Sequence, residues 1–249
     1  MEEIGFWVAA GIAAALVGMS KGGVPVVGML GVPVLALVIN PVTAAGLLLP
    51  VYVVSDIFGL YAYRHAWDAR VLAIVVPGAV VGIAVGWATA SVVPEAAVTL
   101  LVGVIGLAFA ANILLRRPAV VEPKRAEVAP GLFWGGLAGF TSFVSHAGAP
   151  PYQVYTLPLG LTKAVFAGTT TIAFAIINAV KLVPYYALGQ LNPGNLKVAA
   201  VLALPAVVAV FAGVRLVQLM PERLFFRLVV WALALISVKL IWDGSAGLL

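Results

Sequence analysis

Long apolar stretches separated by short polar connections follow one another along the whole chain. Apolar windows of about 17 to 25 residues, the length of an α-helix that crosses a bilayer, recur along it, with some shorter ones between them. Barrel strands would instead alternate apolar and polar residues. The pattern predicts apolar segments at 4–18, 24–39, 42–63, 71–92, 96–115, 131–144, 151–161, 164–188, 196–219 and 224–242. The predicted fold class is an all-α integral membrane protein.

A polar motif interrupts this pattern twice. Ser-x-x-Gly-x-Pro occurs at 20–25, as Ser-Lys-Gly-Gly-Val-Pro, and at 145–150, as Ser-His-Ala-Gly-Ala-Pro. Another proline follows each copy at the same spacing, Pro33 in the first and Pro158 in the second. A duplicated break in apolar sequence that carries a cationic or titratable residue is typical of the binding site of a transporter.

The second half of the chain repeats the order of the first. In both halves two short apolar segments precede three long ones, and Asp56 of the first half corresponds to Asn178 of the second. We therefore expect two repeats, 1–115 and 131–249, within one transmembrane domain. A polar linker at 116–130 joins them.

Basic residues in the connections predict the orientation of the chain in the membrane. They gather between Arg64 and Arg70, in the linker at 116–130, and between Arg215 and Arg227. The positive-inside rule places all three regions in the cytoplasm. Each repeat then has three full crossings plus one short helical hairpin, which either crosses and returns or is re-entrant. This count inverts the second repeat relative to the first, so that the two motif copies approach the midplane from opposite sides.

Small residues at four-residue spacing predict close helix packing. Gly78, Gly82 and Gly86 lie on one face of their segment, and Ala209 with Gly213 repeats the spacing in the second half. Such faces let two helix backbones approach each other closely.

The breaks contain the first candidate site. Lys21 ends the first segment, and a lysine inside the membrane is expensive unless it is paired or functional. The glycine pair at 22–23 breaks the helix, so we expect N–H groups near 24–25 to become donors for an anion. His146 takes the place of Lys21 in the second copy. The alternatives are that Lys21 snorkels to an interface and that His146 only caps a helix.

A second candidate region is a polar stripe on the third segment of each repeat. The residues that share one helical face are Thr171, Phe174, Asn178, Lys181 and Tyr185 in the second repeat, and Tyr52, Asp56 and Tyr63 in the first. Asp56 lies too deep for its short side chain to reach water, so it is either paired or titrating. Lys181 is nearer its helix end, and snorkelling is the alternative for it.

Composition disfavours other classes of protein. Hydrophobic residues make up 63% of the chain and charged residues 9%, whereas soluble domains carry about a quarter charged residues. The formal charge of +5 lies in short connections, so membrane orientation explains it better than nucleic-acid binding. The chain has no cysteine and two histidines, and it lacks phosphate-loop, zinc-protease and hydrolase motifs. We expect no metal, no cofactor and no enzymatic activity.

Several stretches carry a resemblance to a known family: 18–33, 142–152, 157–160, 166–170 and 178–182. In these stretches, and in its overall plan, the chain resembles the sulfite exporter TauE/SafE family of membrane transporters. Members move sulfite, organosulfonates and related sulfur or small carboxylate anions across the bacterial cytoplasmic membrane. The resemblance therefore implies a transporter of such anions.

The hypothesis that combines these observations is a multi-pass secondary transporter of small anions, such as sulfite, organosulfonates or carboxylates, in the cytoplasmic membrane. The expected substrate-binding residues are Ser20, Lys21, Gly22, Gly23, Ser145, His146, Gly148, Thr170, Asn178 and Lys181. Asp56 and His146 are the candidates for proton coupling. The expected partners are a small anion and the lipid bilayer, with no nucleic acid, and a homo-oligomer is left open.

Two other functions fit the same sequence. A passive anion channel on this architecture is the first alternative, and uphill accumulation driven by an ion gradient would exclude it. A membrane enzyme that uses Asp56 and His146 as acid and base is the second, but the chain offers it no recognised nucleophile.

Overall fold

The computed structural model describes residues 2–115, 123–191 and 193–248, and every regular element in these ranges is a helix. The elements in chain order are α1 (Glu2–Lys21), η1 (Pro25–Leu30), α2 (Gly31–Ala36), α3 (Pro41–Tyr63), α4 (Ala69–Thr89), α5 (Glu95–Leu115), α6 (Val128–Ser145), α7 (Ala149–Thr156), η2 (Leu157–Leu159), α8 (Lys163–Ala187), α9 (Pro193–Leu219) and α10 (Glu222–Ala246). Residues 116–122 of the predicted linker lie outside the described ranges. The all-α prediction is confirmed.

Among the described helices, eight are long and apolar enough to cross a membrane: α1, α3, α4, α5, α6, α8, α9 and α10. The prediction of a helical integral membrane protein is thereby confirmed. The first arm of each predicted hairpin is longer than its sequence suggested, because α1 has 20 residues and α6 has 18. Each hairpin therefore joins one full-length helix to a short, broken arm, formed by η1 with α2 or by α7 with η2.

Local sequence signals set several helix ends. The Oδ1 of Asp68 accepts a hydrogen bond from the N–H of Val71 at 2.9 Å, which is the usual contact at the start of a helix, here α4. Helices α3 and α9 begin at a proline, whose fixed φ suits the first helical turn. Gly189 follows α8 with a φ of +70°, a conformation that favours glycine at a helix end.

The chain forms two compact units, and each unit draws helices from both halves of the sequence. The first unit, Met1–Trp67 with Ala167–Met220, contains α1, η1, α2, α3, most of α8, and α9. The second unit, Asp68–Phe166 with Pro221–Leu249, contains α4, α5, α6, α7, η2 and α10. These units differ from the two sequence repeats, which stay a prediction.

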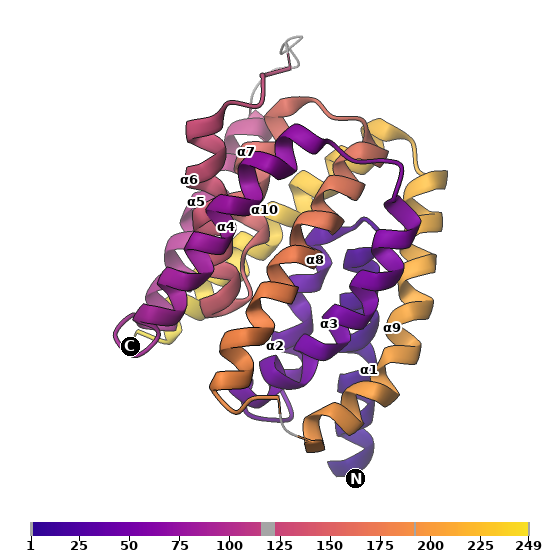
Figure 1. Ribbon diagram of the computed structural model, residues 1–249, viewed down its shortest axis with the longest axis vertical. Coiled ribbons are helices and arrows are strands. Elements are labelled where there is room, and N and C mark those ends of the chain that lie inside the picture. The colour runs from indigo at the N-terminus through magenta and orange to yellow at the C-terminus, as the bar shows by residue number, and fades with distance from the viewer. Residues whose placement is uncertain (1, 116–122, 192, 249) are drawn as a thin grey trace. The chain divides into compact units, whose positions relative to one another are not determined.

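In the first unit, α1 lies along α9, and α3 packs against both (Figure 1). The backbones of α1 and α9 come close at a pair of glycines, because a Cβ added at Gly22 would lie 2.7 Å from the Cα of Gly213. The predicted small-residue face at Gly213 is therefore confirmed. The core beside it consists of small and aliphatic side chains, among them Ala10, Ala13, Ala14, Val17, Leu35, Leu47, Leu48, Val51, Leu202 and Ala206.

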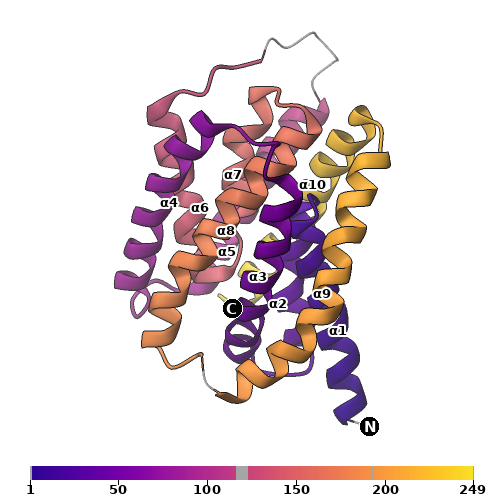
Figure 2. The same cartoon turned by 45° about the vertical axis from the view of Figure 1, so that its right-hand side comes forward.

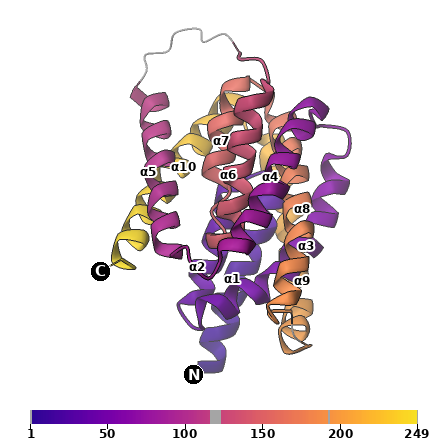
Figure 3. The same ribbon diagram turned by 60° about the vertical axis from the view of Figure 1, so that its left-hand side comes forward.

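In the second unit, α4 lies along α6 (Figure 2), and α5 pairs with α10 (Figure 3). A Cβ added at Gly78 or Gly82 would collide with the backbone of α6, on Leu132 and Gly136 respectively. Gly86 lies against the Phe143 ring, with 3.0 Å between the added Cβ and the nearest ring atom. The predicted packing face of α4 is confirmed, since glycine at these positions is what lets the two helices approach.

Candidate functional site

The first motif copy ends α1 with a glycine-dependent cap. The N–H of Gly23 donates to the carbonyl of Ser20, and the N–H of Val24 donates to the carbonyl of Met19, both at 3.3 Å. This pair of bonds is a Schellman motif, and its turn residue takes a left-handed conformation. Gly23 has a φ of +104°, which a residue with a side chain adopts only at a cost. The helix therefore continues through Lys21 before the chain turns.

The break supplies fewer backbone donors than its sequence suggested. We expected N–H groups near Val24 and Pro25 to face an anion. The N–H of Val24 is used to cap α1, Pro25 has no N–H, and the helix that follows is a short 3₁₀ segment. The groups at Val24 and Pro25 are therefore not available to an anion, and this part of the prediction is wrong.

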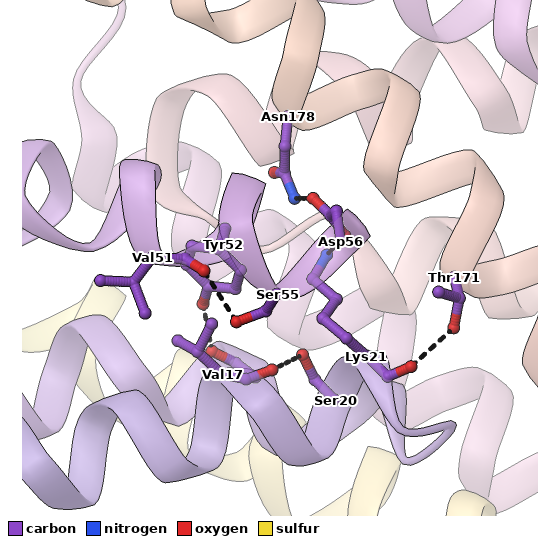
Figure 4. A network of polar contacts seen from close by, with 10 residues as sticks. Val17, Ser20, Lys21, Val51, Tyr52, Ser55, Asp56, Thr171 and Asn178 are labelled. Atoms are coloured by element: carbon purple, nitrogen blue, oxygen red, sulfur yellow. Dashed lines mark hydrogen bonds and ion pairs between the residues drawn. The ribbon is translucent and has the colours of Figure 1, made fainter. Parts of the chain in front are cut away.

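Lys21 forms a buried ion pair with Asp56 (Figure 4). The Nζ of Lys21 lies 2.8 Å from Oδ1 of Asp56, and 5% of each side chain is exposed. The second carboxylate oxygen, Oδ2, accepts a hydrogen bond of 2.8 Å from the Nδ2 of Asn178 on α8. Of the two states predicted for Asp56, paired or titrating, the structure has the pair. Each oxygen of one carboxylate is thus held by a different donor from a different helix.

Two aromatic rings contact the Lys21 ammonium. Its Nζ lies 5.2 Å from the centre of the Tyr52 ring and 5.9 Å from that of the Phe174 ring, which is within the range of cation–π attraction. The hydroxyl of Tyr52 donates to the carbonyl of Gly28 at 2.5 Å, and this bond fixes the ring against η1. These ring contacts add to the ion pair in stabilising the buried ammonium.

A second lysine adds positive charge to the same cluster. Lys181 is 1% exposed, and its Nζ lies 5.5 Å from the centre of the Tyr185 ring. It interacts electrostatically with both Asp56 and Lys21. Snorkelling to the membrane interface is therefore wrong for Lys181 and for Lys21, because both ammonium groups are buried inside the first unit. With all three groups ionised, two positive charges face one negative charge.

The polar stripe of α8 points into this cluster over its whole length. Phe174, Asn178 and Lys181 make the contacts described above, and the hydroxyl of Thr171 donates to the carbonyl of Lys21 at 3.3 Å. The predicted shared face is confirmed. Thr170, the predicted ligand beside Thr171, is 3% exposed, and its contact with substrate stays a prediction.

The stripe of α3 contains a residue that sequence reasoning missed. Gly59 faces the end of α1, and a Cβ there would lie 2.7 Å from Thr171 Cγ2 and 3.3 Å from Lys21 Cβ. Only glycine leaves room for α1 and α8 to meet at this point. The signal was available, because Gly59 continues the helical spacing of Asp56 and Tyr63 on the same face.

Two further hydroxyl groups at the first motif copy form hydrogen bonds within the fold. The hydroxyl of Tyr63 donates to the carbonyl of Gly22 at 2.7 Å, which ties the end of α3 to the break. The hydroxyl of Ser20 donates to the carbonyl of Val17 at 2.6 Å. In this conformation the hydroxyl proton of Ser20 is used within α1, and its contact with a substrate stays a prediction.

The second motif copy, in the second unit, has a different geometry. Helix α6 ends at Ser145, and His146 itself takes the left-handed conformation, with a φ of 53°. The N–H of Ala147 donates to the carbonyl of Thr141, and so does the hydroxyl of Ser145, both at 3.2 Å. Gly148 keeps an ordinary helical φ of −76°. The left-handed residue after the helix is thus a glycine, Gly23, in the first copy and a histidine, His146, in the second.

Helix α7 contains a second residue that the sequence reasoning missed. Gln153 is 0% exposed, and neither its amide oxygen nor its amide nitrogen has a hydrogen-bond partner among the described residues. The hydroxyl of Ser237 on α10 is likewise buried without a partner there. A single glutamine in a short apolar segment was the available signal, because buried amides in membranes are costly unless they have a role.

The eight apolar helices and the enclosed charge cluster define a multi-pass membrane protein with an ionic site inside its helix packing, an arrangement found where ions or polar substrates move. The family model described as sulfite exporter TauE/SafE matches residues 4–240. The chain therefore belongs to this family, which is a family of membrane transporters. Comparison with curated proteins gave no match, and comparison with solved structures gave none.

Proposed function

We propose that the protein is a secondary transporter that carries small oxyanions, such as sulfite, organosulfonates or small carboxylates, across the cytoplasmic membrane. Lys21, Asn178 and Lys181 of the first unit bind the anion. Ser145, His146 and Gly148 stay predicted ligands on the second unit. The family shows that the protein is a transporter. What we propose is the class of anion that it carries, the membrane in which it lies and the coupling of transport to protons.

The observation that supports this assignment is the presence of two buried lysines and a buried amide around one carboxylate. Lys21 forms an ion pair with Asp56, Asn178 donates a hydrogen bond to it, and Lys181 acts on the same group electrostatically. Ammonium and amide groups that hold a carboxylate can hold another oxyanion by the same charge-assisted hydrogen bonds. A buried ion pair is a weak source of stability, so its presence in an apolar core favours a functional role.

Proton coupling is the second part of the proposal. Asp56 is a carboxylate that sits at the anion site rather than at the protein surface, so its protonation changes the charge that a substrate meets. His146 lies at the end of α6 in the second unit and stays the second candidate. The two residues are the proposed carriers of the coupled proton.

Uptake into proteoliposomes tests the function. We expect labelled sulfite and methanesulfonate to accumulate above equilibrium when a pH gradient is imposed, and no accumulation without a gradient. Equilibration without uphill accumulation would instead establish the passive channel. No movement of any sulfite, sulfonate or carboxylate probe would contradict the proposal.

A matched pair of lysines within the first unit tests the site. Lys181→Met removes the buried second charge, whereas Lys197→Met removes an exposed lysine on α9. We expect the first variant to lower the uptake rate by about tenfold or more, since a charged contact to an anion is worth about 1.5 to 3 kcal/mol. The second variant should match the unmodified protein. Equal rates in both variants would remove Lys181 from the site.

A further inference from the structure

The Asp56 carboxylate occupies the donors that an anionic substrate needs. Its Oδ1 is ion-paired with the Lys21 ammonium and its Oδ2 accepts a hydrogen bond from the Asn178 amide, each at 2.8 Å (Figure 4). The exposed fractions of Lys21, Asp56 and Asn178 are 4%, 3% and 5%. Water is therefore a poor substitute acceptor here, and the two donors need an anion or its equivalent at all times.

A substrate anion and an ionised Asp56 compete for this place. Two anions in contact inside a poorly solvated site repel each other strongly. A neutral, protonated Asp56 has no such conflict, because it releases the Lys21 ammonium and needs only ordinary hydrogen bonds. Substrate binding and protonation of Asp56 thus favour each other.

We propose that the substrate places two oxygens of one atom on Lys21 Nζ and Asn178 Nδ2, in place of the Asp56 carboxylate, and that one proton binds to Asp56 with each anion. This inference rests on the proposed function and deepens it. It selects carboxylates, sulfonates and sulfite, which present such oxygen pairs, over halides and other anions with a single acceptor atom.

The charge balance of the cluster explains why one buried site can exist both without substrate and with substrate bound. Without substrate, Lys21 is neutralised by Asp56. With substrate, Lys21 is neutralised by the anion, and Asp56 carries the proton taken from the medium. A monovalent anion and one proton enter together, so the total charge of the site is the same in both states. Lys181, which interacts with Asp56, meets one negative charge in each state.

The other ionisable groups near Asp56 do not replace it in this role. Lys21 on α1 and Lys181 on α8 are the charged residues that act on it, and the Tyr52 phenol lies beside it on α3. The segment 25–36, which forms η1 and α2, has no ionisable side chain. The basic residues that α9 carries are Lys197 and Arg215, and both are exposed. Asp56 is the acidic group at this place, and we assign to it the proton that binds with the anion; Lys181 is the other group of the cluster that can exchange one.

Binding of methanesulfonate to the purified full-length protein in lipid nanodiscs tests the proposal. This probe keeps one negative charge across the assay range, so any pH dependence comes from the protein. We expect its Kd to rise by about tenfold per pH unit on the alkaline side, the slope that one linked proton gives. Calorimetry in two buffers of different ionisation enthalpy should count one proton taken up per anion. Chloride should bind about tenfold to a hundredfold more weakly, because it leaves one buried donor unpaired.

Asp56→Asn separates this inference from the proposed function. The amide imitates a protonated carboxyl, so we expect Asp56→Asn to bind methanesulfonate at least as tightly as the unmodified protein, with a Kd that does not change with pH. Asp243→Asn is the matched control, because Asp243 pairs with Lys239 in an exposed ion pair on α10, and it should keep the pH slope.

The outcomes are distinguishable. Absence of methanesulfonate, sulfite and acetate binding to the unmodified protein would contradict the proposed function itself. Binding without proton uptake, or loss of binding in a folded Asp56→Asn variant, would overturn only the inference. Should Asp56→Asn fail to fold, the proton count is repeated on Lys181→Met, where uptake of one proton per anion would support Asp56 as its site and loss of proton uptake would overturn the inference.

Discussion

The two copies of Ser-x-x-Gly-x-Pro end two long helices in different ways. In the first unit the left-handed residue is Gly23, and Lys21 remains in the helix with its side chain directed at Asp56. In the second unit the left-handed residue is His146, one position after the end of α6. A shared sequence frame therefore does not place the residue at its second position in the same environment. The lysine is a buried cation in a packed cluster, and the histidine is part of a turn.

The polar groups around the two copies differ in kind as well. The first unit surrounds Lys21 with a carboxylate, an amide and a second lysine, all buried and engaged. The second unit buries Gln153, a neutral amide whose polar atoms have no hydrogen-bond partner among the described residues. Charge chemistry is concentrated in one unit, so the two copies should respond differently to matched substitutions.

The largest difference is expected between a buried and an exposed ion pair. Lys21→Ala leaves Asp56 without its cation inside the first unit, which should lower the free energy of unfolding by about 3 to 5 kcal/mol. Lys239→Ala breaks the exposed pair with Asp243 and should cost about 0 to 1 kcal/mol. Denaturant titration in mixed micelles measures both. Similar losses for the two variants would mean that the Lys21 pair is not buried as described.

A double variant separates stability from function at the same place. Lys21→Met with Asp56→Leu removes both charges and keeps apolar volume, so most of the stability should return. Anion uptake should stay lost. Recovery of uptake would show that the pair serves only the fold.

Two buried amides should respond with opposite signs. Asn178→Leu removes the hydrogen bond to a charged Asp56 and should destabilise the protein by about 1.5 to 3 kcal/mol. Gln153→Leu removes an amide that has no partner among the described residues. It should be neutral or stabilising, since a buried polar group without a hydrogen bond lowers the stability of the folded state. A clear loss of stability for Gln153→Leu would reveal that a ligand or water holds this amide.

The two left-handed positions also predict opposite effects. Gly23→Ala forces a side chain into a φ of +104° and would make its Cβ collide with the Tyr63 hydroxyl. It should therefore cost more than the about 1 to 2 kcal/mol of the left-handed backbone alone. His146→Gly relieves a φ of 53°, so its backbone strain falls and the free energy of unfolding should change by less than about 1 kcal/mol. Thermal unfolding of the two variants compares them. If His146→Gly lost more stability than this, the His146 side chain would make a contact that stabilises the protein by more than its backbone strain costs.

The smallest expected effect compares two tyrosines. Tyr63→Phe deletes a hydrogen bond to Gly22, and Tyr155→Phe deletes one to Glu127. Each should cost about 1 kcal/mol, with similar unfolding midpoints. Uptake should fall only for Tyr63→Phe, because its bond fixes the break that carries Lys21. Equal uptake in both variants would show that this bond does not position the lysine.

Local features of this protein were predictable because they depend on neighbours in the sequence. The segment expected at 42–63 is the helix Pro41–Tyr63, since apolar length and a starting proline define it. The face shared by Thr171, Asn178 and Lys181 follows from helical period alone, and it is the face that meets the cluster.

Features that depend on distant segments were not predictable in the same way. That Lys21 pairs with Asp56 and Asn178 requires α1, α3 and α8 to meet, and one sequence does not specify which helices pack together. The N–H donors expected at 24–25 failed for a local reason: the Schellman bonds from Gly23 and Val24 compete for the same groups. Capping geometry is decided by a single φ, which the motif letters do not reveal.

The central claim is that the buried cluster around Lys21 is the anion site, and one comparison of initial uptake rates tests it most directly. Lys21→Met keeps the length of the side chain and removes its charge, and Lys239→Met does the same at the exposed pair. With equal protein in the proteoliposomes, methanesulfonate uptake should fall by at least about thirtyfold in Lys21→Met, as expected for loss of a buried charge contact. It should stay unchanged in Lys239→Met. A rate difference of about twofold corresponds to less than 1 kcal/mol. If Lys21→Met kept an uptake rate within about twofold of the unmodified protein, the account would be contradicted.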